Sequence, residues 1–117
     1  MGSFRLSESE RATDGKKVRV LKLGGDLDAH AFPSLQDRLE SLVAAGAPRV
    51  VLDCRELDYI SSAGLGVLKK MMPEAREAGG DIRLAALSPK IGNIVKLLGF
   101  SKIFRIYDDV EAAASSY

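Results

Sequence analysis

Cysteine, histidine and tryptophan are scarce in this 117-residue chain, which has one cysteine, one histidine and no tryptophan. A single cysteine, Cys54, cannot form a disulfide within the chain, so the class of small domains held together by disulfides is excluded. One cysteine and one histidine, without clustered carboxylates, also fall short of the ligand sets that hold zinc and other transition metals. We therefore expect no metal and no cofactor.

The chain also lacks an excess of either charge and any long apolar run. Its 17 Lys and Arg residues nearly balance its 16 Asp and Glu residues, so it has no positive field to hold nucleic acid or an anionic membrane. The apolar stretches fall far short of the roughly 20 residues that a membrane-spanning helix needs. The first residues have no apolar signal-peptide core. We expect a cytoplasmic protein without direct nucleic-acid contact and without membrane insertion.

The residues that are present indicate one globular domain over residues 1–117. Hydrophobic residues make up 46% of the chain and charged residues 28%, which is ordinary for a folded domain. No repeat or linker divides the sequence. A chain of this length buries roughly two thirds of its unfolded surface, so we expect a single apolar core.

The hydrophobic pattern predicts alternating strands and helices. Short apolar or β-branched runs between turn signals predict strands, over residues 3–11, 18–23, 49–54, 81–87 and 102–107. Apolar residues at helical spacing predict helices, over residues 32–45, 63–72 and 89–98 and in a last segment capped by Asp108. This order predicts an α/β fold: a mixed β-sheet of about five strands packed with about four α-helices.

Local signals set the expected ends of these elements. The segment "GGDLDAH", residues 24–30, is predicted to end the second strand as a loop. Ser88 is predicted to cap the third helix, and Gly99 follows its end. Pro73 lacks the N–H that continues a helix, so we expect the second helix to kink or to end near Met72.

The second helix has an unusually wide apolar surface. Two adjacent stripes run along it, namely Leu65, Leu68 and Met72 beside Gly64, Val67 and Met71. This width exceeds what one core contact needs. We therefore expect the outer stripe to contribute to a partner surface.

The segment "DYISSAGLGVLKK", residues 58–70, contains the residues that bear most directly on function. One of its serines, Ser61 or Ser62, is expected to cap the helix that follows. Gly64 and Gly66 each cost about 0.8–1 kcal/mol in a helix relative to alanine. Their presence indicates a close approach of the backbone, either to a neighbouring strand or to a partner.

Enzymatic interpretations of this segment have less support. The nucleophile elbow G-x-S-x-G is not matched, because Ile60 stands two residues before Ser62. A hydrolase with a triad of Ser62, His30 and Asp28 stays open as a remote alternative. The phosphate-binding patterns are incomplete, since Lys69 stands at the third glycine of G-x-G-x-x-G. We expect a protein that is not an enzyme.

Three segments taken in order resemble the STAS domain, specifically the single-domain bacterial anti-sigma factor antagonists. They are "LKLGGDLDAH", "VVLDCRELDYISSAGLGVL" and "SPKIGNIVKLLGFSKIFRIYDDVEAA". The central motif is an apolar strand ending in Asp, a short loop, a serine doublet and G-L-G. The resemblance covers nearly the whole chain and implies one STAS-like domain over residues 1–117.

The resemblance also implies which residues function. In that family the phosphate acceptor lies two residues before the first glycine of G-L-G, which implies Ser62. Relatives often have Asp immediately before the acceptor, where this sequence has Ser61. The implied partners are an anti-sigma factor serine kinase and a phosphatase that removes the phosphate. The expected partner-binding residues are Asp26, Asp28, Ser61, Ser62, Ala63, Gly64, Leu65 and Gly66.

A phosphate on Ser62 would act as a switch on binding. It would lie at a helix N-terminus, which favours negative charge, so the domain should stay folded. It would also add about −1.5 to −2 charges beside Asp26, Asp28 and Asp58. The unmodified chain would bind the kinase and free a sigma factor, and phosphorylation would end binding. The alternative is a STAS scaffold subunit that binds an ABC-transporter ATPase without a phosphorylation switch.

Overall fold

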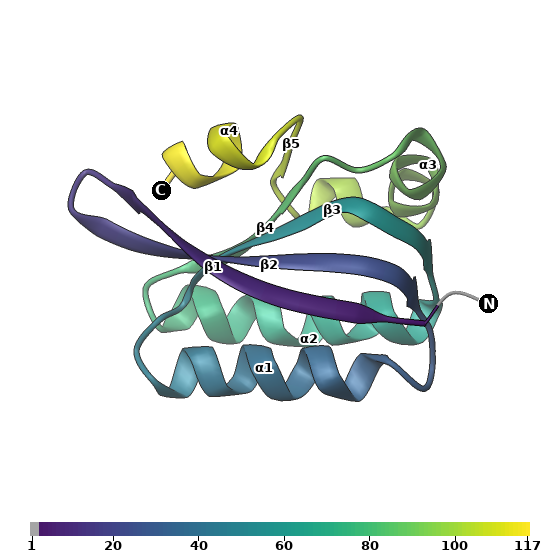
Figure 1. Ribbon diagram of the computed structural model, residues 1–117, viewed down its shortest axis with the longest axis horizontal. Coiled ribbons are helices and arrows are strands. Elements are labelled where there is room, and N and C mark those ends of the chain that lie inside the picture. The colour runs from purple at the N-terminus through teal and green to yellow at the C-terminus, as the bar shows by residue number, and fades with distance from the viewer. Residues whose placement is uncertain (1–2) are drawn as a thin grey trace.

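The computed structural model describes residues 3–117, which form a mixed five-stranded sheet in the order β1-β2-β3-β4-β5 (Figure 1). The strands are β1 (Arg5–Thr13), β2 (Lys16–Leu27), β3 (Arg49–Ile60), β4 (Asp81–Ala85) and β5 (Ile106–Tyr107). The helices are α1 (Phe32–Ala44), α2 (Ser62–Glu77), α3 (Pro89–Leu97) and α4 (Val110–Ser115), with a short 3₁₀ helix, η1 (Phe100–Lys102). The predicted α/β class, with its mixed five-stranded sheet and four helices, is confirmed.

Each connection has a local cause. β1 and β2 pair antiparallel through a tight turn at Asp14 and Gly15, whose φ angles are 47° and 75°. Positive φ at both residues is typical of the Asp-Gly type I′ hairpin turn. The other neighbouring strands pair in parallel, which requires a crossover, usually a helix. The crossovers accordingly contain α1 between β2 and β3, α2 between β3 and β4, and α3 followed by η1 between β4 and β5.

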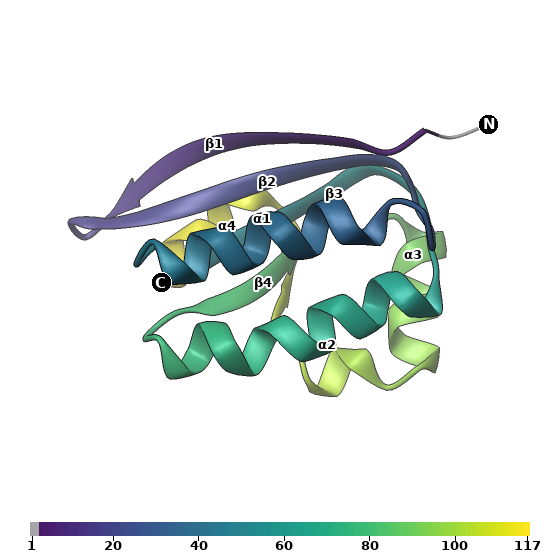
Figure 2. The ribbon, with the colours of Figure 1, turned by 90° about the horizontal axis from the view of Figure 1, so that it is seen from below.

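The helices cover the two faces of the sheet unequally. α1 and α2 lie side by side on one face, and α4 lies on the other (Figures 1 and 2). The larger core fills the α1–α2 side and includes Leu21, Leu52 and Met71. Cys54 is buried in this core, and burial raises the pKa of its thiol to about 12. A smaller core, which includes Val20 and Val51, lies beneath α4.

Two strands are longer than predicted. β2 continues through Gly24 to Leu27, and β3 continues past Cys54 to Ile60, so the predicted loop at residues 24–30 begins only after Leu27. The two extensions pair with each other across two register shifts. Gly25 adopts φ of 76°, and a side chain there would collide with the backbone of Ser3. Gly24 and Gly25 therefore belong to an irregular part of the strand and not to a turn. The turn propensity of glycine alone does not distinguish these two cases.

Pro73 does not end the second helix. α2 continues for four residues to Glu77, so of the two predicted outcomes, a kink or an early end near Met72, the early end is wrong. Pro73 is exposed, whereas Ala75 in the next turn is fully buried. Arg76 also forms an ion pair with Asp81, with 2.9 Å between Nε and Oδ1. These tertiary contacts hold the last turn in place despite the lost backbone hydrogen bond.

The last third of the chain also departs from the prediction. Residues 102–107 do not form one strand, because η1 precedes a two-residue β5. Phe104 turns inward and is 3% exposed, with its ring stacked on Phe100 at a centroid distance of 6.0 Å. Asp109, not Asp108, caps α4 by accepting from the Ala112 amide at 2.7 Å.

The third helix agrees with its local signals. Ser88 caps it by accepting from the Ile91 amide at 3.2 Å. Gly99 follows it in the left-handed region with φ of 78°, the usual way to end a helix. Leu98, the last residue of the predicted range, lies just past the end of the helix at Leu97 and is 54% exposed.

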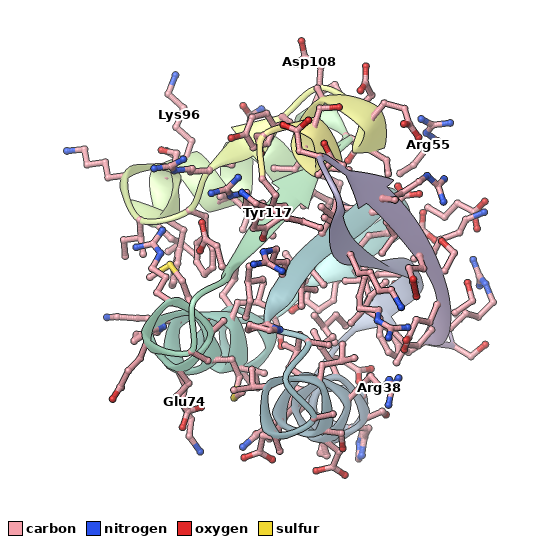
Figure 3. The ribbon with its side chains drawn as sticks, turned by 90° about the vertical axis from the view of Figure 1, so that its left-hand side faces the viewer. Arg38, Arg55, Glu74, Lys96, Asp108 and Tyr117 are labelled. Atoms are coloured by element: carbon pink, nitrogen blue, oxygen red, sulfur yellow. The ribbon has the colours of Figure 1, made fainter. Side chains whose placement is uncertain are left out.

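A buried ion-pair network joins β4 to α2 and to the end of α4. Asp81 is 3% exposed and accepts from Arg76 at 2.9 Å and from Arg83 at 3.1 Å. Tyr117 lies over this network, with the Arg83 guanidinium 3.9 Å from its ring centre (Figure 3). The Tyr117 hydroxyl lies 2.7 Å from the carbonyl oxygen of Asp81, and burial raises its pKa well above the usual value.

Candidate functional site

The predicted site lies where the carboxyl ends of β2 and β3 meet. Leu27 pairs with Ile60 at the ends of these strands, and the Ser61 amide donates to the Leu27 carbonyl at 2.9 Å. This bond joins the loop after β2 to the start of α2, at the right-hand end of the sheet in Figure 1. In α/β proteins the carboxyl edge of parallel strands is the usual location of binding residues. The structure thus brings the two predicted segments, around residues 26–28 and 61–66, to one edge.

The two serines have different positions and different hydrogen bonds. Ser61 has extended backbone, and its Oγ caps α2 by accepting from the Gly64 amide at 3.1 Å. Ser62 is the first residue of α2 and is exposed. Within residues 3–117, no hydrogen bond engages the Ser62 hydroxyl. The capping function therefore belongs to Ser61, and the Ser62 hydroxyl is available for chemistry.

Acidic side chains surround this edge. Asp28 Oδ1 accepts from the His30 and Ala31 amides, both at 3.0 Å, and so shapes the turn before α1. Asp26 is half-buried and Asp58 is exposed. In the described part of the chain, none of these three carboxylates forms an ion pair. The edge therefore has negative charge that no neighbouring cation neutralises by direct contact.

One residue at this edge was not among the predicted site residues. Tyr59 lies opposite Asp26 in the β2–β3 register and is 43% exposed. An exposed aromatic ring beside polar groups is common in protein interfaces. The sequence indicates Tyr59 only as an aromatic residue between Leu57 and Ile60, which are buried. Its position beside Asp26 follows from the strand pairing and is not visible in the sequence.

The two glycines of G-L-G differ in how closely other parts of the chain approach them. A Cβ on Gly64 would lie 2.9 Å from Leu27 Cγ and 3.1 Å from the Leu27 carbonyl oxygen. Gly64 therefore lets α2 approach the end of β2. A Cβ on Gly66 would meet nothing within 4 Å, and Gly66 is exposed. The fold requires the first glycine and leaves the second unexplained.

Alanine substitutions should separate these two roles. We expect Gly64→Ala to lower the free energy of unfolding by about 1–3 kcal/mol, because the new methyl group overpacks against Leu27. We expect Gly66→Ala to raise it by up to about 1 kcal/mol, because alanine is the better helix former. Urea denaturation of both variants measures the difference. Equal changes in the two variants would contradict the assignment.

The outer stripe of α2 is not a partner surface. The apolar side chains of both stripes are buried, from 1% to 6% exposed, and they are Leu65, Val67, Leu68, Met71 and Met72. The reason is that α1 packs beside α2, so α2 contacts a helix as well as the sheet (Figure 2). The surface of the first turns of α2 is limited to Ser62, Ala63, Gly66 and the lysines Lys69 and Lys70.

The geometry does not assemble the hydrolase triad. His30 is exposed in the turn before α1, and the Asp28 carboxylate bonds to backbone amides and not to the imidazole. Over residues 3–117, no hydrogen bond joins Ser62 to His30. The same residues contain no group of three metal-ligating side chains and no helix long and apolar enough to cross a bilayer.

Comparison with known proteins places these features in a family. A family model described as the STAS domain matches residues 11–113. The putative anti-sigma factor antagonist BtrV of Bordetella bronchiseptica is 35% identical over 104 residues, which are 89% of this chain and 88% of that protein. The structure of an anti-sigma factor antagonist from Mycobacterium paratuberculosis superimposes with a TM-score of 0.79 at 23% identity, covering 96% of this chain and 93% of that one.

A further structural relative is a phosphorylated protein. The Bacillus cell fate determinant SpoIIAA, solved in its phosphorylated form, has a TM-score of 0.69 at 21% identity, covering 98% of this chain and 100% of its own. The fold, the family model and the BtrV similarity agree over nearly the whole chain. The chain belongs to the STAS domain family, among the anti-sigma factor antagonists.

Proposed function

We propose that the unphosphorylated chain binds an anti-sigma factor serine kinase and thereby frees a sigma factor, and that phosphorylation of Ser62 ends this binding. The observation that carries the proposal is that the hydroxyls of Ser61 and Ser62 have different roles in the structure. Ser61 already uses its hydroxyl as the cap of α2, whereas the Ser62 hydroxyl is exposed and unbonded in the described chain. The acceptor therefore can be modified without removing a structural hydrogen bond.

The first turn of α2 is suited to receive a phosphate. Among its first amides, that of Gly64 donates to Ser61 Oγ, and those of Ser62 and Ala63 have no acceptor within residues 3–117. Free amides and the helix dipole together favour an anion at this position. The modified domain should therefore remain folded, and the effect of phosphorylation falls on the partner.

The surroundings explain why a phosphate would weaken partner binding. It would add about −1.5 to −2 charges to an edge that already contains Asp26, Asp28 and Asp58. The proposed contact surface consists of the loop after β2 and the exposed part of the 61–66 turn. Its residues are Asp26, Asp28, Ser61, Ser62, Ala63 and Gly66, with Gly64 and Leu65 beneath them. An unpaired charge pressed into such an interface typically costs about 2–5 kcal/mol.

Two relatives support the proposal. BtrV is described as a putative anti-sigma factor antagonist, and SpoIIAA has been solved in a phosphorylated form. We infer that this chain likewise acts by binding and not by catalysis, with a phosphatase restoring the active form. The alternative, a scaffold subunit bound to a transporter ATPase, would leave the free hydroxyl of Ser62 without a function.

Phosphorylation of the purified chain tests the acceptor. A serine kinase captured from the native cell by the full chain is expected, with ATP, to add one phosphate, which mass spectrometry places on Ser62. Ser62→Ala should stay unmodified, because no other hydroxyl takes its position, and it serves as the matched control. Phosphate on Ser61 or Ser88 would contradict the assignment. Capture of a transporter ATPase in place of a kinase would favour the scaffold.

A further inference from the structure

The outer side of α3 and the turn that follows it combine apolar and cationic side chains on one surface. We call this surface the α3 face, and it consists of Lys90, Lys96, Leu97, Leu98 and Lys102. We propose that the α3 face binds the surface of an anionic lipid bilayer, with the two leucines entering the interfacial layer. The inference does not depend on the proposed function, because it uses none of the residues proposed to contact the kinase.

The two leucines of the α3 face are unusually exposed. Four large apolar side chains are exposed within residues 3–117, and the two most exposed are Leu97 at 85% and Leu98 at 54%. Single exposed apolar residues are common on protein surfaces, but these two are adjacent in the chain. Because apolar side chains are unfavourable in water, a surface that removes both leucines from water would be favoured as a binding partner.

The core determines which side of α3 faces outward. Ile91 and Val95 are each 1% exposed and anchor the inner side of the helix in the larger core. Lys90 and Leu97 are two helical turns apart and so lie on the same outer side. α3 lies at the right-hand margin of the molecule in Figures 1 and 2, with no other element outside it. Leu97 therefore cannot turn inward without removing Ile91 and Val95 from the core.

Tight backbone turns keep two of the lysines near the leucines. Lys96 directly precedes Leu97. The Gly99 amide donates to the Lys96 carbonyl at 3.0 Å, and the Lys102 amide donates to the Gly99 carbonyl at 3.3 Å. Residues joined by such turns have Cα atoms less than about 7 Å apart. Figure 3 shows the Lys96 side chain extending away from the sheet. The long flexible stems of Lys96 and Lys102 let their ammonium groups reach the plane of the leucines.

The segment that contains the α3 face has charge of one sign. Residues 82–107 include five Lys or Arg residues and no Asp or Glu, although the whole chain has a net charge of only +1. Within residues 3–117, none of Lys90, Lys96 and Lys102 forms an ion pair. The balanced total of the sequence therefore conceals a local excess of positive charge. An anionic surface would complement it.

The composition of the α3 face favours a bilayer over an acidic protein. Protein interfaces are enriched in arginine and depleted in lysine, whereas all three cations of this face are lysines. A lysine ammonium is a compact charge that needs no planar partner, which suits the diffuse field of anionic headgroups. The leucines lie at a projecting helix end, and a bilayer accepts such a projection without a preformed pocket. Apolar contact combined with attraction to anionic lipids is typical of peripheral membrane binding.

A tryptophan at position 97 tests the proposal directly, because the chain contains no tryptophan of its own. The fluorescence of Leu97→Trp should shift to shorter wavelength when vesicles of phosphatidylcholine and phosphatidylglycerol are added. Vesicles of phosphatidylcholine alone should give no shift, because the attraction requires anionic headgroups. Ser7→Trp is the matched control, since Ser7 is exposed on β1 and lies outside the α3 face. It should give no shift with either kind of vesicle.

Co-sedimentation with the same anionic vesicles measures the affinity. Lys96→Gln and Lys102→Gln should each weaken binding about fivefold, through loss of one cation near the anionic surface. Leu97→Gln should weaken it about tenfold, through loss of one buried leucine. Lys17→Gln is the matched control at the β1–β2 turn, at the other end of the molecule (Figure 1), and should change binding by less than about twofold. All these side chains are exposed, and circular dichroism establishes that each variant is folded.

Several results would overturn the proposal. They are the absence of both the fluorescence shift and co-sedimentation with anionic vesicles, equal binding to uncharged vesicles, or an equal loss in Lys17→Gln. Saturable binding of a peptide of alternating leucine and glutamate, without vesicle binding, would assign the α3 face to a protein partner instead. These assays contain no kinase and use the unphosphorylated chain. Their failure would therefore leave the proposed function untouched, and a failure of the kinase experiments would leave this inference untouched.

Discussion

Ser62→Asp is expected to weaken binding of the cognate anti-sigma kinase by roughly 30-fold to several thousand-fold, whereas Ser62→Ala should bind as tightly as the unphosphorylated wild type. The hydroxyl of Ser62 makes no hydrogen bond within residues 3–117, so its removal takes nothing from the fold. A carboxylate there adds charge beside Asp26, Asp28 and Asp58. Calorimetry or surface plasmon resonance with the purified kinase measures the difference.

Ser7→Asp is a matched control for this substitution. Ser7 is exposed on the edge strand β1, opposite Lys22 and outside the proposed contact surface. The same change of side chain there should leave kinase binding within about twofold of wild type. Added salt should restore part of the affinity that Ser62→Asp loses, because salt screens repulsion between exposed charges. If neither Ser62→Asp nor the enzymatically phosphorylated chain binds more weakly than wild type, the charge-switch mechanism is wrong.

Asp81→Asn is expected to lower the free energy of unfolding by about 3 kcal/mol or more and the Tm by roughly 10–15 °C. The Asp81 side chain is 5% exposed and pairs with Arg83, whose side chain is 10% exposed, at 3.1 Å. Removal of the negative charge leaves the Arg83 guanidinium buried without its counter-ion. Truncation of one member of such a pair is much more costly than loss of a surface pair.

Glu111→Gln is the matched acid-to-amide control for the buried pair. Glu111 pairs with Arg11 at 3.1 Å, but their side chains are 74% and 41% exposed. We expect a change of no more than about 1 kcal/mol there, because water and salt screen surface pairs. Thermal and urea denaturation of the two variants provide the comparison. An effect of Asp81→Asn as small as that of Glu111→Gln would show that the network does not hold β4 to α2.

The elements predicted correctly are those whose ends have strong local signals. Ser88 and Gly99 bound α3 as predicted, because a capping hydroxyl and a left-handed glycine act within one helical turn. The elements predicted wrongly depend on distant contacts. β2 and β3 lengthened because each extension supplies hydrogen bonds to the other. α2 continues beyond Pro73 because Ala75 is buried in the core and Arg76 forms an ion pair with Asp81.

Some features of the candidate site are likewise visible in the sequence, whereas others depend on tertiary contacts. The position of Ser62 two residues before Gly64 is a property of the motif and is visible in the sequence. Which serine caps the helix is not visible, since both have the same hydroxyl and only the backbone angles place Ser61 Oγ near the Gly64 amide. The stripe predicted to face a partner is buried because α1 occupies that side of α2, and no pattern within α2 reports the position of α1.

By itself the sequence predicted the fold class and the family, and it indicated which serine we propose as the acceptor, because hydrophobic period, caps and a contiguous motif are local along the chain. Only the tertiary structure decided which surfaces are free. Strand pairing put Tyr59 beside Asp26, and it brought the segments around residues 26–28 and 61–66 to one edge of the sheet. The physical reason is that burial and charge clustering depend on which segments meet across the sheet, and this is settled by packing of the whole chain.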